Sequence, residues 1–197
     1  MNLTEMRTRV REDLQDTDSE NYRWTNDEVD GAIDRVVTEY SMYAPIQQQD
    51  DIATTDGDTE LDTSSLSGLL KIESVEFPTG KTPKYMQHFE HWAGKLYMQD
   101  KGDGSNARVR WLKKHTLTAE STTIPTEHDE VIVLGATGYL AMSASANTVD
   151  RAFVAGPYGT TSYKAWAIER LRRYDFKLQD ISHMNRIVRR NLYCEDD

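Results

Sequence analysis

The stretch Trp24-Thr25-Asn26-Asp27-Glu28-Val29, at residues 24–29, marks the start of a helix on which the other helices are expected to pack. The Thr25 hydroxyl is spaced to accept the backbone N–H of Glu28, and the Glu28 carboxylate to reach back to the N–H of Thr25. This is the capping-box pattern of a helix N-terminus. Apolar residues at helical spacing continue the stripe to Tyr40, and Pro45 ends the helix.

Three further helices are predicted on either side of this one. Residues 3–15 carry an apolar face at three-to-four spacing. Residues 126–146 follow a proline, begin with acidic side chains and contain many small residues, which allow close helix approach. Residues 162–190 form the last and longest helix.

The period of the apolar residues changes between residues 46 and 120. Residues 70–77 have the pattern of a β-strand, and the cluster at 100–106 is a strong turn signal. Residues 48–66 suggest a long polar loop. The sequence therefore predicts a mainly α fold. We expect a four-helix bundle from residues 1–45 and 121–182, a small antiparallel β insertion at 46–120, and a C-terminal arm at 183–197.

Composition limits the possible functions. The net charge is -10, and residues 1–60 hold sixteen Asp/Glu against five Lys/Arg. A contiguous basic surface, which nucleic-acid wrapping needs, is therefore not expected, whereas a negative passage through which DNA slides is compatible. The single cysteine, Cys194, excludes an intrachain disulfide. No apolar run is long enough to cross a bilayer, no secretory signal is visible, and folding inside the cell is expected.

Candidate catalytic and metal-binding groups are weak. His88 and His91 have no matching second pair of ligands, so we expect no metal site and no cofactor. Residues 16–27 have calcium-loop features but lack the glycine and the final glutamate, and a solvated loop between helices is favoured. An acidic cluster could support a small hydrolase only if a carboxyl were desolvated, and nothing apolar surrounds it. Its members are Asp50, Asp51, Asp56 and Asp58. No catalytic residue is predicted.

The last helix carries a basic stripe interleaved with aromatic residues. A solvated face, docking on an acidic protein neighbour and direct DNA contact all remain open interpretations, since arginine and aromatic side chains are favoured interface anchors. The stripe consists of Arg170, Arg172, Arg173, Lys177, Arg186, Arg189 and Arg190, with Trp166, Tyr174 and Tyr193 beside them.

Four segments in order resemble the head-to-tail connector adaptors of tailed phages and viruses. Residues 21–28 (NYRWTNDE) resemble the opening of these proteins, and residues 75–80 (VEFPTG) resemble their central sheet. Residues 123–136 are similar to the start of their third helix, and residues 163–171 to their last. The acidic loop at 48–62 and the tail after Asn191 depart from the pattern.

The resemblance implies a structural subunit of the virion neck rather than an enzyme. It implies a ring of about twelve copies beneath the portal protein, with DNA passing through the lumen and the next neck or tail ring attached below. It assigns portal docking to the C-terminal arm, at Arg186, Arg189, Arg190, Leu192 and Tyr193. Candidates for the contact between ring subunits are Gly138, Ala141, Trp166 and Arg170. A neighbouring neck component, such as a stopper or tail terminator, is the alternative, and a small hydrolase using the acidic loop is a remote one.

Overall fold

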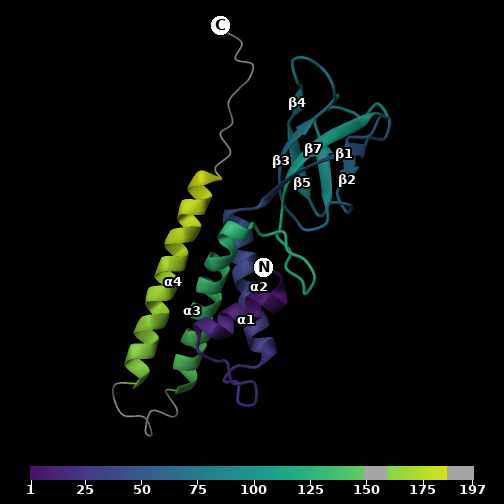
Figure 1. The fold of residues 1–197 in the computed structure, drawn as a ribbon. Coiled ribbons are helices and arrows are strands. Elements are labelled where there is room, and N and C mark those ends of the chain that lie inside the picture. Colours follow the sequence, from purple (N-terminus) through teal and green to yellow (C-terminus); the bar gives the residue numbers. More distant parts are fainter. Residues whose placement is uncertain (149–158, 186–197) are drawn as a thin grey trace. The chain divides into compact units, whose positions relative to one another are not determined.

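The computed structural model describes residues 1–148 and 159–185 of the chain (Figure 1). They fold into two compact units. Met1–Ala44 and His115–Arg186 form a helical unit, and Pro45–Lys114 form a β unit. Each unit has its own hydrophobic core.

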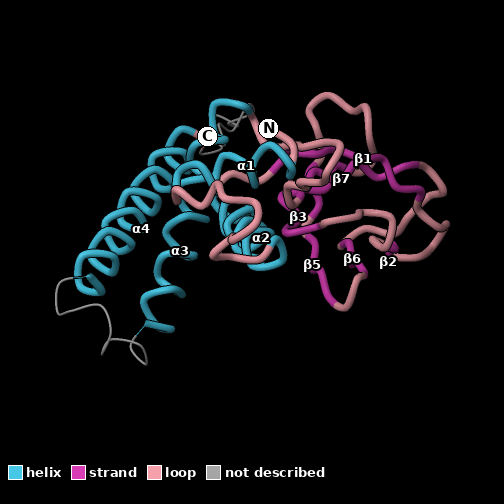
Figure 2. The backbone as a smooth tube through the Cα atoms, turned by 60° about the horizontal axis from the view of Figure 1, so that its bottom comes forward, coloured by secondary structure: helices cyan, strands magenta, loops and turns pink. Residues whose placement is uncertain are grey.

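The prediction of a mainly α fold, a four-helix bundle with a small β insertion, is wrong. The described chain contains seven strands in two antiparallel sheets beside its α-helices, so the fold is a mixture of α and β (Figure 2). The physical reason lies in the strand Ile46–Ala53, which was expected to be mostly polar loop. Its side chains are largely exposed, so it is held by ladder hydrogen bonds rather than by an alternating apolar face.

Within the described residues, the helical unit contains four α-helices and one short 3-10 turn. The bounds are Leu3–Asp13 for α1, Asn26–Tyr43 for α2, Thr126–His128 for η1, Asp129–Thr148 for α3 and Gly159–Met184 for α4. The predicted capping box is confirmed: the N–H of Glu28 donates to Thr25 Oγ1 at 3.2 Å, and the N–H of Thr25 donates to Glu28 Oε2 at 2.7 Å. A second capping box joins Asn2 and Glu5 at the start of α1.

Helices α3 and α4 lie side by side (Figure 1), and two glycines of α3 make this close approach possible. A Cβ at Gly135 would lie 2.9 Å from the Tyr174 ring, and one at Gly138 would lie 2.8 Å from Leu171 Cδ2. Tyr174 is fully buried there and its hydroxyl donates to the Val36 carbonyl at 3.4 Å. The predicted role of the small residues in close helix packing is therefore confirmed.

The β unit has two sheets. One has the order β1-β7-β3-β4 and the other β2-β6-β5, with every pairing antiparallel. The bounds are Ile46–Ala53 (β1), Glu60–Asp62 (β2), Leu69–Glu76 (β3), Met86–Gln87 (β4), Phe89–Trp92 (β5), Lys95–Met98 (β6) and Asn106–Lys113 (β7). Their shared core includes Leu61, Ile72, Val75, Phe77, Leu96, Val109 and Trp111.

Candidate functional site

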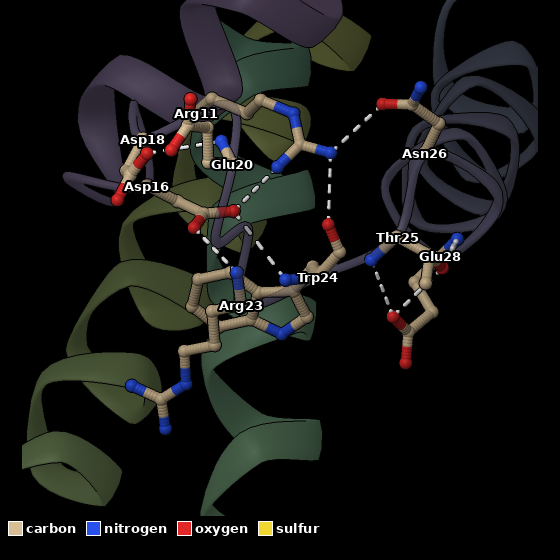
Figure 3. Close-up of polar contacts among 9 residues, drawn as sticks. All are labelled: Arg11, Asp16, Asp18, Glu20, Arg23, Trp24, Thr25, Asn26 and Glu28. Atoms are coloured by element: carbon tan, nitrogen blue, oxygen red, sulfur yellow. Dashed lines mark hydrogen bonds and ion pairs between the residues drawn. The ribbon is translucent and has the colours of Figure 1, made fainter.

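A buried ion pair holds the connection between α1 and α2 (Figure 3). Arg11 and Asp16 are only 5% and 7% exposed, and Arg11 Nη1 donates to Asp16 Oδ2 at 2.5 Å. The other Asp16 oxygen accepts the backbone N–H of Arg23 at 2.7 Å. Arg11 Nη2 donates to the Trp24 carbonyl and to Asn26 Oδ1, both at 2.9 Å. Asp16 therefore serves the fold, whereas residues 17–23 of the same connection are exposed, as expected for a solvated loop between helices.

The same guanidinium stacks on an aromatic ring, and this arrangement recurs in the helical unit. Arg11 lies 3.6 Å from the Tyr22 ring centroid while bonded to Asp16. Guanidinium groups favour aromatic faces and carboxylate oxygens together, because the charge is delocalised over a flat group. We call such a set an arginine–ring–carboxylate site.

Two further sites of this kind join different helices. Arg35 lies 3.8 Å from the Tyr139 ring centroid and donates to Glu39 at 3.1 Å, while the Tyr139 hydroxyl donates to the same carboxylate at 2.8 and 2.9 Å. Burial and the Glu39 carboxylate raise the pKa of Tyr139 to about 12, so it stays a donor. Arg170 lies 4.7 Å from the Trp166 ring centroid and is paired with Asp13.

The four residues predicted for a subunit contact are used largely within the subunit. Gly138 lies beneath Leu171, and Ala141 is fully buried. Arg170 donates to Thr137 Oγ1 at 2.9 Å in addition to its pair with Asp13, and burial lowers its pKa. Trp166 is half-buried beside it. Their role between subunits stays a prediction.

The residues predicted to dock on the portal protein lie outside the described part of the chain. These are Arg186, Arg189, Arg190, Leu192 and Tyr193.

The acidic cluster behind the hydrolase alternative is divided among strand pairings and turns. Asp51 accepts two hydrogen bonds from Arg108, at 2.9 and 3.2 Å, and the Arg108 guanidinium lowers the pKa of this carboxyl. Asp50 accepts the indole N–H of Trp111 at 2.7 Å. Asp58 accepts the backbone N–H of Glu60 at 3.1 Å in a turn. A general acid needs a raised pKa, and the hydrogen bonds at Asp51 act in the opposite direction.

The histidines of the β unit are not grouped with other ligands. His91 Nε2 lies 3.3 Å from the Thr63 hydroxyl. Across residues 1–148 and 159–185, no three His, Cys, Asp or Glu side chains are close enough together to hold a metal ion. None of the helices in these residues is both long and apolar enough to span a membrane.

A buried histidine, missed at the level of the sequence, joins the end of α2 to the segment around Thr123 within the helical unit. His115 is 5% exposed and its Nε2 lies 2.8 Å from the Ala44 carbonyl. Its Nδ1 lies 2.9 Å from the Thr123 carbonyl, and its backbone N–H donates to Ser41 Oγ at 3.0 Å. Burial lowers the pKa of His115. A lone histidine in a polar segment gives no sequence signal for this role.

Large apolar side chains remain on the surface of both units. Among the aromatic residues whose exposure the structure describes, Trp92 at 76% and Phe176 at 63% are the most exposed. Phe176 lies on the face of α4 opposite the buried residues Tyr174, Leu178 and Ile181.

Comparison with known proteins gives little further guidance. No protein-family model and no curated protein matches the sequence. Among solved structures, a chain of the virion of a native gene transfer agent particle is similar with a TM-score of 0.32 and 9% identity, over 84% of this chain and 87% of that one. A TM-score of this size does not establish a shared fold.

Proposed function

We propose that this protein is a structural subunit of a tailed-virus particle, an adaptor whose ring joins the capsid portal to the neck. The proposal starts from the ordered resemblance of the four sequence segments to connector adaptors. The structural observation that carries it is the difference in charge between helices α2 and α4 of the helical unit. Helix α2 holds five acidic residues against one arginine, and α4 holds five Lys/Arg against three acidic residues.

The face of α4 has the composition of a protein contact. Phe176 is exposed, and Arg172 and Arg173 lie one turn before it on the same helix. Aromatic and arginine side chains are the commonest anchors of protein interfaces. The exposed side of α2 offers Asp27 as a charge partner.

Two different complementary faces are what a closed ring requires. In a ring with cyclic symmetry each copy contacts its neighbours through two distinct surfaces. The α4 face of one copy would therefore dock on the α2 face of the next, and the lumen of the ring would carry DNA. The non-enzymatic part of the proposal is supported by the separation of the acidic cluster into structural pairs.

The ring is tested by adding purified protein to portal-containing heads and imaging the necks by electron microscopy. The wild-type protein is expected to add a ring, and Phe176→Asp to abolish or greatly reduce it. Tyr85→Asp, the same aromatic-to-acid change at an exposed ring of the β unit, is the matched control and should add a normal ring. Equal decoration by Phe176→Asp and wild type would contradict the α4–α2 contact.

The identity of the platform separates an adaptor from its alternative. An adaptor binds bare portal protein, whereas a stopper or tail terminator binds only a ring already in place. A pull-down with purified portal distinguishes them. Removal of residues 185–197 is expected to abolish portal binding while far-UV circular dichroism stays unchanged, and normal binding by that truncated chain would contradict the docking role of the C-terminal arm.

A further inference from the structure

The outer face of the sheet β2-β6-β5 presents aromatic rings among carboxylates. Directly opposed residues of an antiparallel sheet point to the same face. The register gives two outward rows, Glu60, Tyr97 and Glu90 in one and Asp62, Lys95 and Trp92 in the other. The alternate residues Leu61, Leu96 and Met98 are buried in the core of the β unit.

The aromatic side chain at the end of this face is held by a tight turn. Trp92 and Lys95 are paired across a two-residue loop, Ala93-Gly94, whose φ angles are 49° and 77°. Positive φ at both loop positions is the requirement of the type I′ hairpin turn, which matches the twist of the strands. Trp92, at 76% exposure, thus lies directly before a defined hairpin turn and is open to solvent.

The charges on the face are mostly negative. Lys95, its one base, is paired with Glu60. Asp62 accepts the N–H and hydroxyl of Ser64, at 2.8 and 2.9 Å. Glu90 is exposed, and no hydrogen bond or ion pair engages its side chain within the described part of the chain. Glu90 and Trp92 are two residues apart on β5, so they share this face at a separation of roughly 7 Å.

Other sites in the same chain show which group binds between an aromatic ring and a carboxylate. In the helical unit a ring and a carboxylate flank a guanidinium at Arg11, Arg35 and Arg170. The β5–β6 face offers the ring and the carboxylate without the guanidinium. We infer that this face binds an arginine side chain from a segment of another protein chain, with the guanidinium stacked on Trp92 and hydrogen-bonded to Glu90. The inference does not depend on the proposed ring.

The test is an NMR titration of the full-length protein with short blocked peptides. The probes are Gly-Arg-Gly-Arg-Gly, its lysine counterpart and its citrulline counterpart, and the readout is the indole N–H of Trp92, assigned with Trp92→Phe. Saturable shifts are expected with the arginine peptide. The lysine peptide should bind about threefold to fivefold more weakly, because the planar guanidinium stacks and bridges better. The neutral citrulline peptide should give no saturable shift.

Two variants distinguish binding at this site from nonspecific binding of the peptide. Glu90→Gln keeps the shape of the face and should weaken the arginine peptide by about threefold. Tyr85→Ala removes another exposed aromatic, 56% exposed beside β4, and should leave the titration unchanged.

Three results would overturn the inference. One is equal binding of the arginine and citrulline peptides, and another is no effect of Glu90→Gln. The third is a blue shift of Trp92 fluorescence on phosphatidylcholine vesicles without any peptide response, which would assign the face to a lipid surface.

Discussion

Replacement of Asp16 by alanine should be among the most damaging single changes in the helical unit. It removes the carboxylate that accepts Arg11 Nη1 at 2.5 Å and the Arg23 N–H at 2.7 Å, and leaves the Arg11 side chain, 6% exposed, without its counter-ion. Removing one partner of a buried ion pair costs about 3–5 kcal/mol. Since domains are stable by only about 5–15 kcal/mol, the loss would remove about a fifth or more of the total stability.

The change is measured by urea denaturation followed at 222 nm, where the helices dominate the signal. With a slope of roughly 1–3 kcal/mol per molar urea, the midpoint should fall by more than 1 M. Asp18→Ala is the matched control: Asp18 lies in the same loop, and its bonds to Glu20 and Asn21 are exposed. Its effect should stay within about 0.5 kcal/mol.

A double variant keeps the prediction testable if Asp16→Ala fails to fold. Asp16→Ala leaves the Arg11 charge buried without a counter-ion, and Arg11→Met removes that charge. The double variant Arg11→Met with Asp16→Ala should therefore be more stable than Asp16→Ala alone. Two results would refute the view that an unpaired, buried guanidinium is the main penalty. One is a loss of unfolding free energy below about 1 kcal/mol for Asp16→Ala, and the other is a double variant that is less stable than Asp16→Ala.

Two other predictions concern packing and pH. Gly138→Val should destabilise the helical unit by about 1–3 kcal/mol in the same urea assay, because its Cβ would lie 2.8 Å from Leu171 Cδ2. Gly31→Ala, where a Cβ meets nothing within 4 Å, should instead stabilise α2 by up to about 1 kcal/mol, and the reverse order would contradict the α3–α4 contact. Burial lowers the pKa of His115 in the fold, so stability that is complete above the unfolded value near 6.5 should be lost as the pH falls from there through the folded pKa. The difference in midpoint between wild type and His115→Gln should therefore change between about pH 7 and pH 5, and a constant difference would show that His115 does not titrate with unfolding.

Local signals predicted the helices well, because a capping box involves residues three apart. Thr25 and Glu28 define the start of α2 without help from the rest of the chain. The strand β1 had no such signal, since its register is set by β7 about sixty residues later, with Gln48 opposite Trp111. A strand with both faces largely exposed carries no alternation of apolar residues, so periodicity predicts a loop there.

The candidate sites were harder to predict for the same reason of sequence distance. Arg170 was predicted as an interface residue from its place in a basic stripe, but its partner Asp13 lies 157 residues away and could not be deduced from spacing. Trp92 received no role, although its two-residue Ala93-Gly94 turn is a local signal that indicates an exposed hairpin tip. A basic stripe in the sequence identifies a charged helix, but it does not show which of the arginines are paired with carboxylates of the same chain.

The use of apolar residues favours an assembly over an isolated protein. Only 38% of the chain is hydrophobic, yet two separate cores are completed while Trp92 and Phe176 stay at 76% and 63% exposure. Burying a large apolar side chain is worth about 1.5–3 kcal/mol. Each of these rings could therefore contribute binding free energy to a contact that the free subunit does not make. The two lie on different units, Phe176 beside Arg172 and Arg173 and Trp92 beside Glu90, with opposite charges around them. The two proposed contacts therefore involve partners of opposite chemistry, an acidic one for α4 and an arginine-bearing one for the β5–β6 hairpin.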